Sequence, residues 1–97
     1  MVIEIRQTHE YANWFEKLRD RRARAKILVR VRRLSLGNAG DVSPVGEGVS
    51  ELRINYGPGY RVYFKQHDEV WIVLLAGGDK RTQQRDIARA KELARNL

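Results

Sequence analysis

Residues 48–87 read GVSELRINYGPGYRVYFKQHDEVWIVLLAGGDKRTQQRDI, and this stretch decides the fold. It holds three runs rich in Val, Ile, Tyr, Phe and Trp, separated by Gly, Pro, His and Asp. Such a pattern is typical of successive β-strands joined by turns. A Gly-Gly pair and a basic segment follow the third run. We therefore expect three consecutive strands and then a helix, with the rest of the chain covering the sheet.

The alternation of apolar residues predicts how the first two strands pair. The alternating sets are Leu52, Ile54 and Tyr56 on one strand, and Tyr60, Val62 and Phe64 on the next. Both sets face one side of the sheet if Gly57-Pro58-Gly59 forms the turn, since glycine tolerates positive φ. The opposite side then carries Arg53, Arg61, Tyr63 and Lys65, with Arg53 roughly across from Tyr63. Three cations and a phenol on one face predict an anion site.

The third run, Glu69 to Ala76, is apolar on both faces, which is typical of an interior strand covered above and below. Its two sets are Trp71, Val73 and Leu75, and Val70, Ile72 and Leu74. Gly77-Gly78 predicts a sharp turn at the edge of the sheet, because glycine frees the backbone. That turn would bring Lys80 or Arg81 to the rim of the cationic face.

The segments outside this sheet predict one further strand and three helices. Val2 to Arg6 alternates like a half-buried strand, and Thr8 and Asp20 are suitable N-caps for two helices in succession. The first has an apolar stripe of Tyr11, Trp14, Phe15 and Leu18; the second runs from Arg21 to about Leu36, with Gly37 as its C′ residue. The two should form an antiparallel hairpin.

Residues 38–48 predict a loop, and residues 82–96 predict a C-terminal helix. The expected order is β-α-α-β-β-β-α, an α+β fold with helices packed on a largely antiparallel sheet. At 97 residues the chain is expected to form a single domain, residues 1–97.

The net charge of +7 and pI of about 10.2 are the strongest compositional signals. Nine cations fall within residues 17–33 against one acid, and six within residues 80–97 against two. Lys26, Arg30 and Arg33 lie on one flank of the second predicted helix. Clustered cations attract polyanions. The distribution favours contact with nucleic acid, although an acidic protein partner would use the same patches.

Several classes of site and location are disfavoured. The chain has no cysteine, and His9 and His67 are not spaced as ligands relative to carboxylates, so we expect two solvated histidines and no metal site. Neither a nucleophile elbow nor a phosphate-binding P-loop is present. With no apolar run that could span a bilayer and no signal peptide, a cytoplasmic protein without membrane contact or cofactor is expected.

Phosphoryl chemistry on RNA suits the remaining residues. When a 2′-hydroxyl attacks the neighbouring phosphate, fixed Arg and Lys side chains stabilise the charge that builds on the phosphate oxygens. Tyr63 is a candidate for stacking a base. The general acid and base are not evident, unless Glu51 or a lysine serves. Alternatively, Arg53 and Arg61 form ion pairs with Glu51 or Glu69; the sequence leaves both interpretations open.

The stretches GNAGDVSPVGEGVSELRINYGPGYRVYF and LLAGGDKRTQQRDI resemble the RelE/ParE superfamily of type II toxin–antitoxin toxins, most closely its HigB-like "addiction module killer" branch. The resemblance covers nearly the whole chain. It implies a RelE-like α+β domain that cleaves mRNA on the ribosome without metal and inhibits translation. It also implies a cognate helix-turn-helix antitoxin. The antitoxin would contact operator DNA, and the toxin would reach that DNA only through the antitoxin.

Residues that match the family motifs take on expected roles through this resemblance. Arg53 of ELRI, Arg61 of GYRVYF and Lys80 of GGDK fall on the basic catalytic positions. The resemblance also points to Arg81, and the cationic face and the basic helix add Tyr63, Lys65, Lys26, Arg30 and Arg33 as expected RNA-binding residues. RelE and HigB supply a tyrosine or a histidine from the helix after the last strand, where this chain has Thr82, Gln83, Gln84, Asp86 and Ile87.

Two other functions remain open. ParE relatives share the fold and inhibit DNA gyrase, so the resemblance also allows a gyrase inhibitor without nuclease activity. A basic domain that binds RNA or DNA without toxicity is the third possibility.

Overall fold

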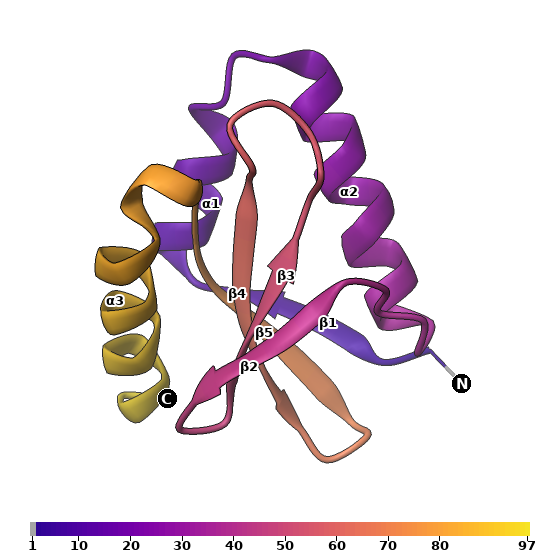
Figure 1. Cartoon of the computed structure of the whole chain (residues 1–97). Helices are drawn as coiled ribbons and strands as arrows, with labels where there is room; N and C mark the ends of the chain where they lie inside the picture. Colours follow the sequence, from indigo (N-terminus) through magenta and orange to yellow (C-terminus); the bar gives the residue numbers. More distant parts are fainter. Residues whose placement is uncertain (1) are drawn as a thin grey trace.

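A computed structural model describes residues 2–97 as a five-stranded sheet with helices on both faces (Figure 1). The strands are β1 (Glu4–Gln7), β2 (Val42–Gly46), β3 (Val49–Arg53), β4 (Arg61–His67) and β5 (Trp71–Gly78). They lie in the order β1-β5-β4-β3-β2. Every neighbouring pair is antiparallel except β1 and β5, which are parallel. The predicted α+β class with a largely antiparallel sheet is confirmed.

Two helices cover one face of the sheet and the third covers the other. They are α1 (His9–Glu16), α2 (Arg21–Ser35) and α3 (Gln83–Arg95), the last preceded by a 3-10 turn, Lys80–Thr82. Figure 1 shows α1 and α2 following one another in roughly opposite directions, as the predicted hairpin requires. Within residues 2–97, no helix is long and apolar enough to cross a membrane.

The predicted helix boundaries follow from their capping side chains. Thr8 Oγ1 accepts a hydrogen bond from the Tyr11 amide at 3.0 Å, and Asp20 Oδ1 accepts one from the Arg22 amide at 2.9 Å. These side chains satisfy amides that have no partner inside the helix. Gly37 follows α2 with φ of 82°, as predicted for a C′ glycine. Local chemistry therefore sets where α1 and α2 begin and where α2 ends.

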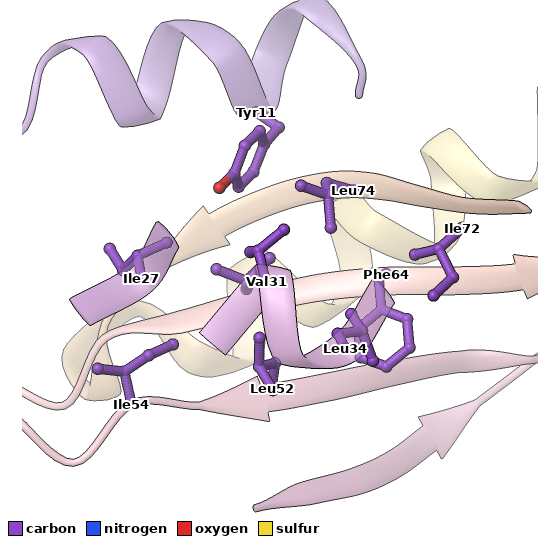
Figure 2. Close-up of a cluster of buried hydrophobic side chains, with 10 residues drawn as sticks. Tyr11, Ile27, Val31, Leu34, Leu52, Ile54, Phe64, Ile72 and Leu74 are labelled. Atoms are coloured by element: carbon purple, nitrogen blue, oxygen red, sulfur yellow. The ribbon is translucent and has the colours of Figure 1, made fainter. Parts of the chain in front are cut away.

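The larger core lies between α1, α2 and the sheet (Figure 2). Its fully buried members include Ile27 of α2, Leu52 of β3, Val62 of β4 and Ile72 of β5. The expectation that Leu52 and Ile54 share one face with Val62 and Phe64 is confirmed, since all four belong to this cluster. Burial of this apolar surface is the main stabilising contribution to the fold.

The second core lies under α3, on the face predicted to carry cations. Ala90 and Ala94 of α3 pack with Val49, Tyr63, Val73 and Leu75 of the sheet. α3 therefore covers this face over Tyr63, which the sequence did not indicate. β5 is buried from Ile72 to Ala76, which confirms an interior strand covered on both sides. Val70, expected within that strand, lies in the preceding turn and is 65% exposed.

The β3–β4 register differs from the prediction by two residues. Arg53 pairs with Arg61, and Tyr63 pairs with Glu51, so Arg53 does not lie across from Tyr63. A shift of two residues leaves every side chain on its predicted face, which is why the apolar alternation could not reveal it. The strands close with the Ile54 amide donating to the Tyr60 carbonyl at 2.9 Å. The connecting turn is therefore wider than three residues.

The segment predicted as a loop, residues 38–48, contains β2, so the element order is β-α-α-β-β-β-β-α. β2 pairs with β3 and includes Pro44, which is tolerated because β2 lies at the edge of the sheet. Gly and Pro signal turns in the sequence, and here they mark a short edge strand with an irregular register between Pro44 and Gly46.

Gly77 and Gly78 end β5 without positive φ, so they are not the predicted turn residues. A Cβ atom on Gly77 would lie 2.2 Å from the Trp14 ring, and one on Gly78 would lie 1.8 Å from Asp86 Oδ2. Both distances are far inside van der Waals contact. Glycine is required here because α1 and α3 approach the strand closely from its two faces.

We predict that Gly77→Ala lowers the free energy of unfolding by about 1–3 kcal/mol, because the new methyl group displaces the Trp14 ring. Urea denaturation followed by circular dichroism measures the loss. The same substitution in a Trp14→Leu background should cost less, since the smaller side chain leaves room. Equal losses in both backgrounds would show that the Trp14 contact is not the cause.

Candidate functional site

The three residues expected to be catalytic line one groove. Arg53, Arg61 and Lys80 border a hollow of about 270 Å³ together with Asp41, Ile54, Asn55, Gly59 and Tyr60. Arg53 ends β3, Arg61 begins β4, and Lys80 follows β5. The fold thus brings residues from three parts of the chain to one end of the sheet.

Backbone contacts at the β3–β4 turn hold this groove together. The Lys80 amide donates to the Pro58 carbonyl at 3.4 Å, which ties the start of the 3-10 turn to the hairpin loop. Gly59 has φ of 78°, and a Cβ there would lie 3.3 Å from Arg61 Nη1 and 3.5 Å from Lys80 Cβ. The absence of a side chain at Gly59 leaves space between the two cations.

Arg61 is held by a buried carboxylate. Its Nε lies 3.4 Å from Glu51 Oε2, and the two side chains are 12% and 2% exposed. Its Nη1 donates to the Gly59 carbonyl at 2.8 Å, whereas Nε is buried and not hydrogen-bonded. The Arg61–Glu51 contact is therefore an ion pair without a well-aligned hydrogen bond. The sequence allowed Arg61 to form an ion pair with Glu51, and that alternative is confirmed. The pair is buried and does not lie at the surface.

Glu51 is the centre of a small polar cluster beneath α3. Its Oε2 accepts a hydrogen bond from Gln83 Nε2 at 2.8 Å and one from the Tyr63 hydroxyl at 3.3 Å. Burial, and then the charge of Glu51, raise the pKa of Tyr63 above its usual range. Tyr63 is fully buried, so the expectation that it stacks a base is wrong for this conformation. Glu51, likewise buried and engaged, is not placed to act as general base.

Arg53 and Lys80 are the more exposed cations of the groove. Arg53 pairs with Asp41 through Nη2 at 2.8 Å, and its side chain is 42% exposed. The sequence predicted Glu51 or Glu69 as the partner of Arg53, and that prediction is wrong, since the partner is Asp41. Lys80 is exposed and makes no ion pair with any of residues 2–97. An entering anion would meet Lys80 directly and would compete with Asp41 for Arg53.

Tyr60 is a groove residue that the sequence reasoning missed. The apolar alternation assigned it to the core, and its ring does contact Trp14 edge-on at 6.3 Å between centroids. It is only half-buried, and it also lines the groove beside Arg61. A tyrosine at the end of a strand can serve both surfaces, because its ring is apolar and its hydroxyl is polar. Its position directly before Arg61 was the available signal.

The predicted RNA-binding residues separate into different places. Arg81 borders a hollow of about 390 Å³ with Lys80 and Arg85, next to the groove. Asp79 forms a 3.0 Å ion pair with Arg81 and, through its hydrogen bonds, raises the pKa of that guanidinium. Lys65 lies against Gly48, at the other end of β4 from Arg61. Lys65 is thus far along the strand from the groove.

On α2, Lys26, Arg30 and Arg33 border a third hollow of about 410 Å³ that shares Ile54 and Asn55 with the groove. Arg30 donates to the carbonyls of Arg53 at 2.6 Å and Ala39 at 3.1 Å. These bonds hold α2 against the end of β3, a structural role that the sequence did not indicate. Lys26 and Arg33 remain exposed at the surface.

Among residues 2–97, no three His, Asp or Glu side chains gather as a metal site would require. His67, expected to be solvated in a turn, ends β4 and stacks on Trp71 at 3.9 Å between ring centroids. His9 begins α1 and is exposed, as predicted. Neither histidine lines the groove.

Comparison with known proteins supports the sequence resemblance. The family model described as "Phage derived protein Gp49-like (DUF891)" matches residues 13–97. A protein of Haemophilus influenzae (strain ATCC 51907 / DSM 11121 / KW20 / Rd), named only "Uncharacterized protein", is 50% identical over 97 residues. The alignment covers all of this chain and 98% of that relative. The match includes every residue of the groove.

We predict that Glu51→Gln lowers the free energy of unfolding by about 1–3 kcal/mol, because Arg61 loses its buried counter-charge. Chemical denaturation measures the change. Glu47→Gln is the matched control: Glu47 forms an exposed ion pair with Arg95, and such pairs contribute little to stability because water screens them. Equal effects of the two substitutions would contradict the assigned role of Glu51.

Proposed function

The chain belongs to the Gp49-like family of phage-derived proteins, a family of toxin–antitoxin toxins of RelE-like type, and we propose that it is a HigB-like mRNA endonuclease. In this proposal residues 1–97 form one toxin domain that acts on ribosome-associated mRNA in the cytoplasm and inhibits translation without a metal ion. A cognate helix-turn-helix antitoxin neutralises it. The observation that carries the proposal is the convergence of Arg53, Arg61 and Lys80 on one groove.

The groove chemistry suits cleavage through the RNA 2′-hydroxyl. As the 2′-oxygen bonds to phosphorus and the 5′-oxygen leaves, charge accumulates on the non-bridging oxygens. Arg61 is the fixed donor, because its ion pair with Glu51 holds the guanidinium in place before substrate binds. Lys80, which is exposed and unpaired within residues 2–97, supplies a second charge from the opposite side of Gly59.

Tyr60 and Asp41 are the proposed proton-transfer residues. Both line the groove, and they replace the tyrosine or histidine that the helix after the last strand lacks. The Asp41 carboxylate accepts the proton of the 2′-hydroxyl, and the Tyr60 hydroxyl donates one to the departing 5′-oxygen. Asp41 must first release Arg53, which is then free to bind the phosphate.

A gyrase inhibitor without nuclease activity is the second candidate. One observation favours it: Arg53 and Arg61 already have carboxylate partners, so much of the positive charge in the groove is neutralised. A binding protein needs no unpaired catalytic cation, and ParE toxins belong to the same superfamily that the sequence resembles.

We predict that Lys80→Ala and Arg61→Ala each reduce mRNA cleavage by about 10²–10³-fold, because each removes a donor to the developing charge. Induced expression followed by primer extension maps the cut sites. Lys91→Ala is the charge-matched control: Lys91 is half-buried on α3 and does not line the groove, so this variant should cleave like wild type. Growth arrest with intact mRNA in the wild type would instead favour gyrase as the target.

We predict that Tyr60→Phe slows cleavage by about 10²–10⁴-fold while the fold is retained, because the ring still packs on Trp14. Single-turnover cleavage and thermal unfolding measure the two properties. Tyr56→Phe is the control, since its hydroxyl bonds to Asp20 at 2.9 Å and does not line the groove. Unchanged cleavage by Tyr60→Phe would exclude this residue from proton transfer.

A further inference from the structure

The outer face of α2 is apolar although the opposite face of the helix already fills the core. Ala23, Ile27 and Val31 are buried against the sheet. On the other side, Leu28, Val29 and Leu36 are 55, 51 and 53% exposed. With Ala25 they recur at helical spacing and form one stripe, which we call the outer stripe. Figure 1 places α2 along the margin of the molecule. One apolar side of α2 packs in the core, and the second apolar side is exposed and available to a partner.

Cations lie beside the outer stripe and within it. Residues 21–35 contain seven Arg and Lys side chains and no acid. Arg22, Lys26 and Arg33 lie along one side of the stripe, whereas Arg21 and Arg32 lie in line with it, each one helical turn before Ala25 and Leu36 respectively. None of these five forms an ion pair with another of residues 2–97. The face therefore combines exposed aliphatic side chains with positive charge that no acid of residues 2–97 neutralises.

The stripe is also hollowed on one side. Ala25 and Val29 border the 410 Å³ hollow with Lys26, Arg30 and Arg33, and its far wall is Ile54 and Asn55. An inserted aliphatic side chain would contact Val29 and Ile54 while its neighbours remain within reach of Lys26. The hollow therefore fits an apolar anchor that is accompanied by negative charge.

We propose that the outer face of α2 is the docking site for an acidic amphipathic helix of a protein partner. If the function proposed above holds, that partner is the antitoxin, so this identification rests on the proposed function. Apolar residues of the partner helix cover Leu28 and Val29, and its Asp and Glu side chains pair with the cations beside and within the stripe. A 15-residue helix such as α2 is about 22 Å long, so the partner helix needs about four turns.

RNA is a poorer occupant of this face. Residues 21–35 include no aromatic side chain on which a base could stack, and phosphate contacts do not bury Leu28 or Val29. An occupant of the hollow would also reach Ile54 and Asn55, which line the groove of Arg53 and Arg61 as well. Docking there places the partner beside the groove, where it obstructs a long RNA.

The test measures binding of the purified full chain to its purified cognate antitoxin, which is the probe. Leu28→Glu with Val29→Glu places two like charges opposite the acidic helix without disturbing a buried contact. Val70→Glu with Leu97→Glu is the matched control, because these residues are 65 and 57% exposed and lie outside α2. We expect the α2 pair to weaken antitoxin binding at least about 30-fold, and the control pair to leave it unchanged.

Growth gives a second readout. The α2 pair should still arrest growth when expressed alone, and the antitoxin should no longer rescue it. Wild-type affinity in the α2 pair would overturn the proposal. The proposal would also be overturned if the α2 pair lost mRNA cleavage but still bound the antitoxin, because the face would then bind RNA. Because binding is measured on purified proteins, it decides the docking site even if the wild type cuts no mRNA and the nuclease proposal fails.

Discussion

The buried carboxylate of Glu51 links the fold to the groove. It accepts hydrogen bonds from Gln83 of α3 and Tyr63 of β4, and it pairs with Arg61, so this one side chain of β3 connects α3 and β4. A charge beneath a helix is unfavourable unless it is paired and hydrogen-bonded, and here both conditions are met. The cluster has a functional consequence too. It fixes the Arg61 guanidinium in the groove wall before any anion arrives, and the preorganised donor then needs little rearrangement when charge develops.

Close approach of helices to the sheet is the second constraint on the structure. Trp14 of α1 lies over Gly77, and Asp86 of α3 lies over Gly78, on opposite faces of one strand. These two contacts bring α1 and α3 against the end of β5. Lys80 follows directly, and its amide is tied to Pro58 of the hairpin turn. The glycine pair thus positions a cation that is far in sequence from Arg53 and Arg61, and the groove depends on this closeness.

Charge is distributed so that two surfaces have different properties. In the groove, Asp41 and Glu51 partly neutralise Arg53 and Arg61, and Lys80 is left exposed to attract an anion. On α2, the cations have no acidic partners within residues 2–97, and they flank aliphatic side chains. A single net charge of +7 therefore describes neither surface well. The groove is suited to a phosphate, whereas the outer stripe is suited to an acidic helix, and the two meet at Ile54 and Asn55.

The sequence alone determined the features that depend on neighbours along the chain. Apolar alternation set which face each strand residue occupies, and Thr8, Asp20 and Gly37 set helix ends, because capping and pleating are local. The grouping of Arg53 and Arg61 followed from the same alternation. Only the tertiary structure decided the pairing of Arg53 with Arg61, since a two-residue slip changes partners without changing faces. It also decided that α3 buries Tyr63, that β2 joins the sheet and that Gly77 and Gly78 serve packing. These outcomes depend on contacts between segments distant in sequence, which no local pattern encodes.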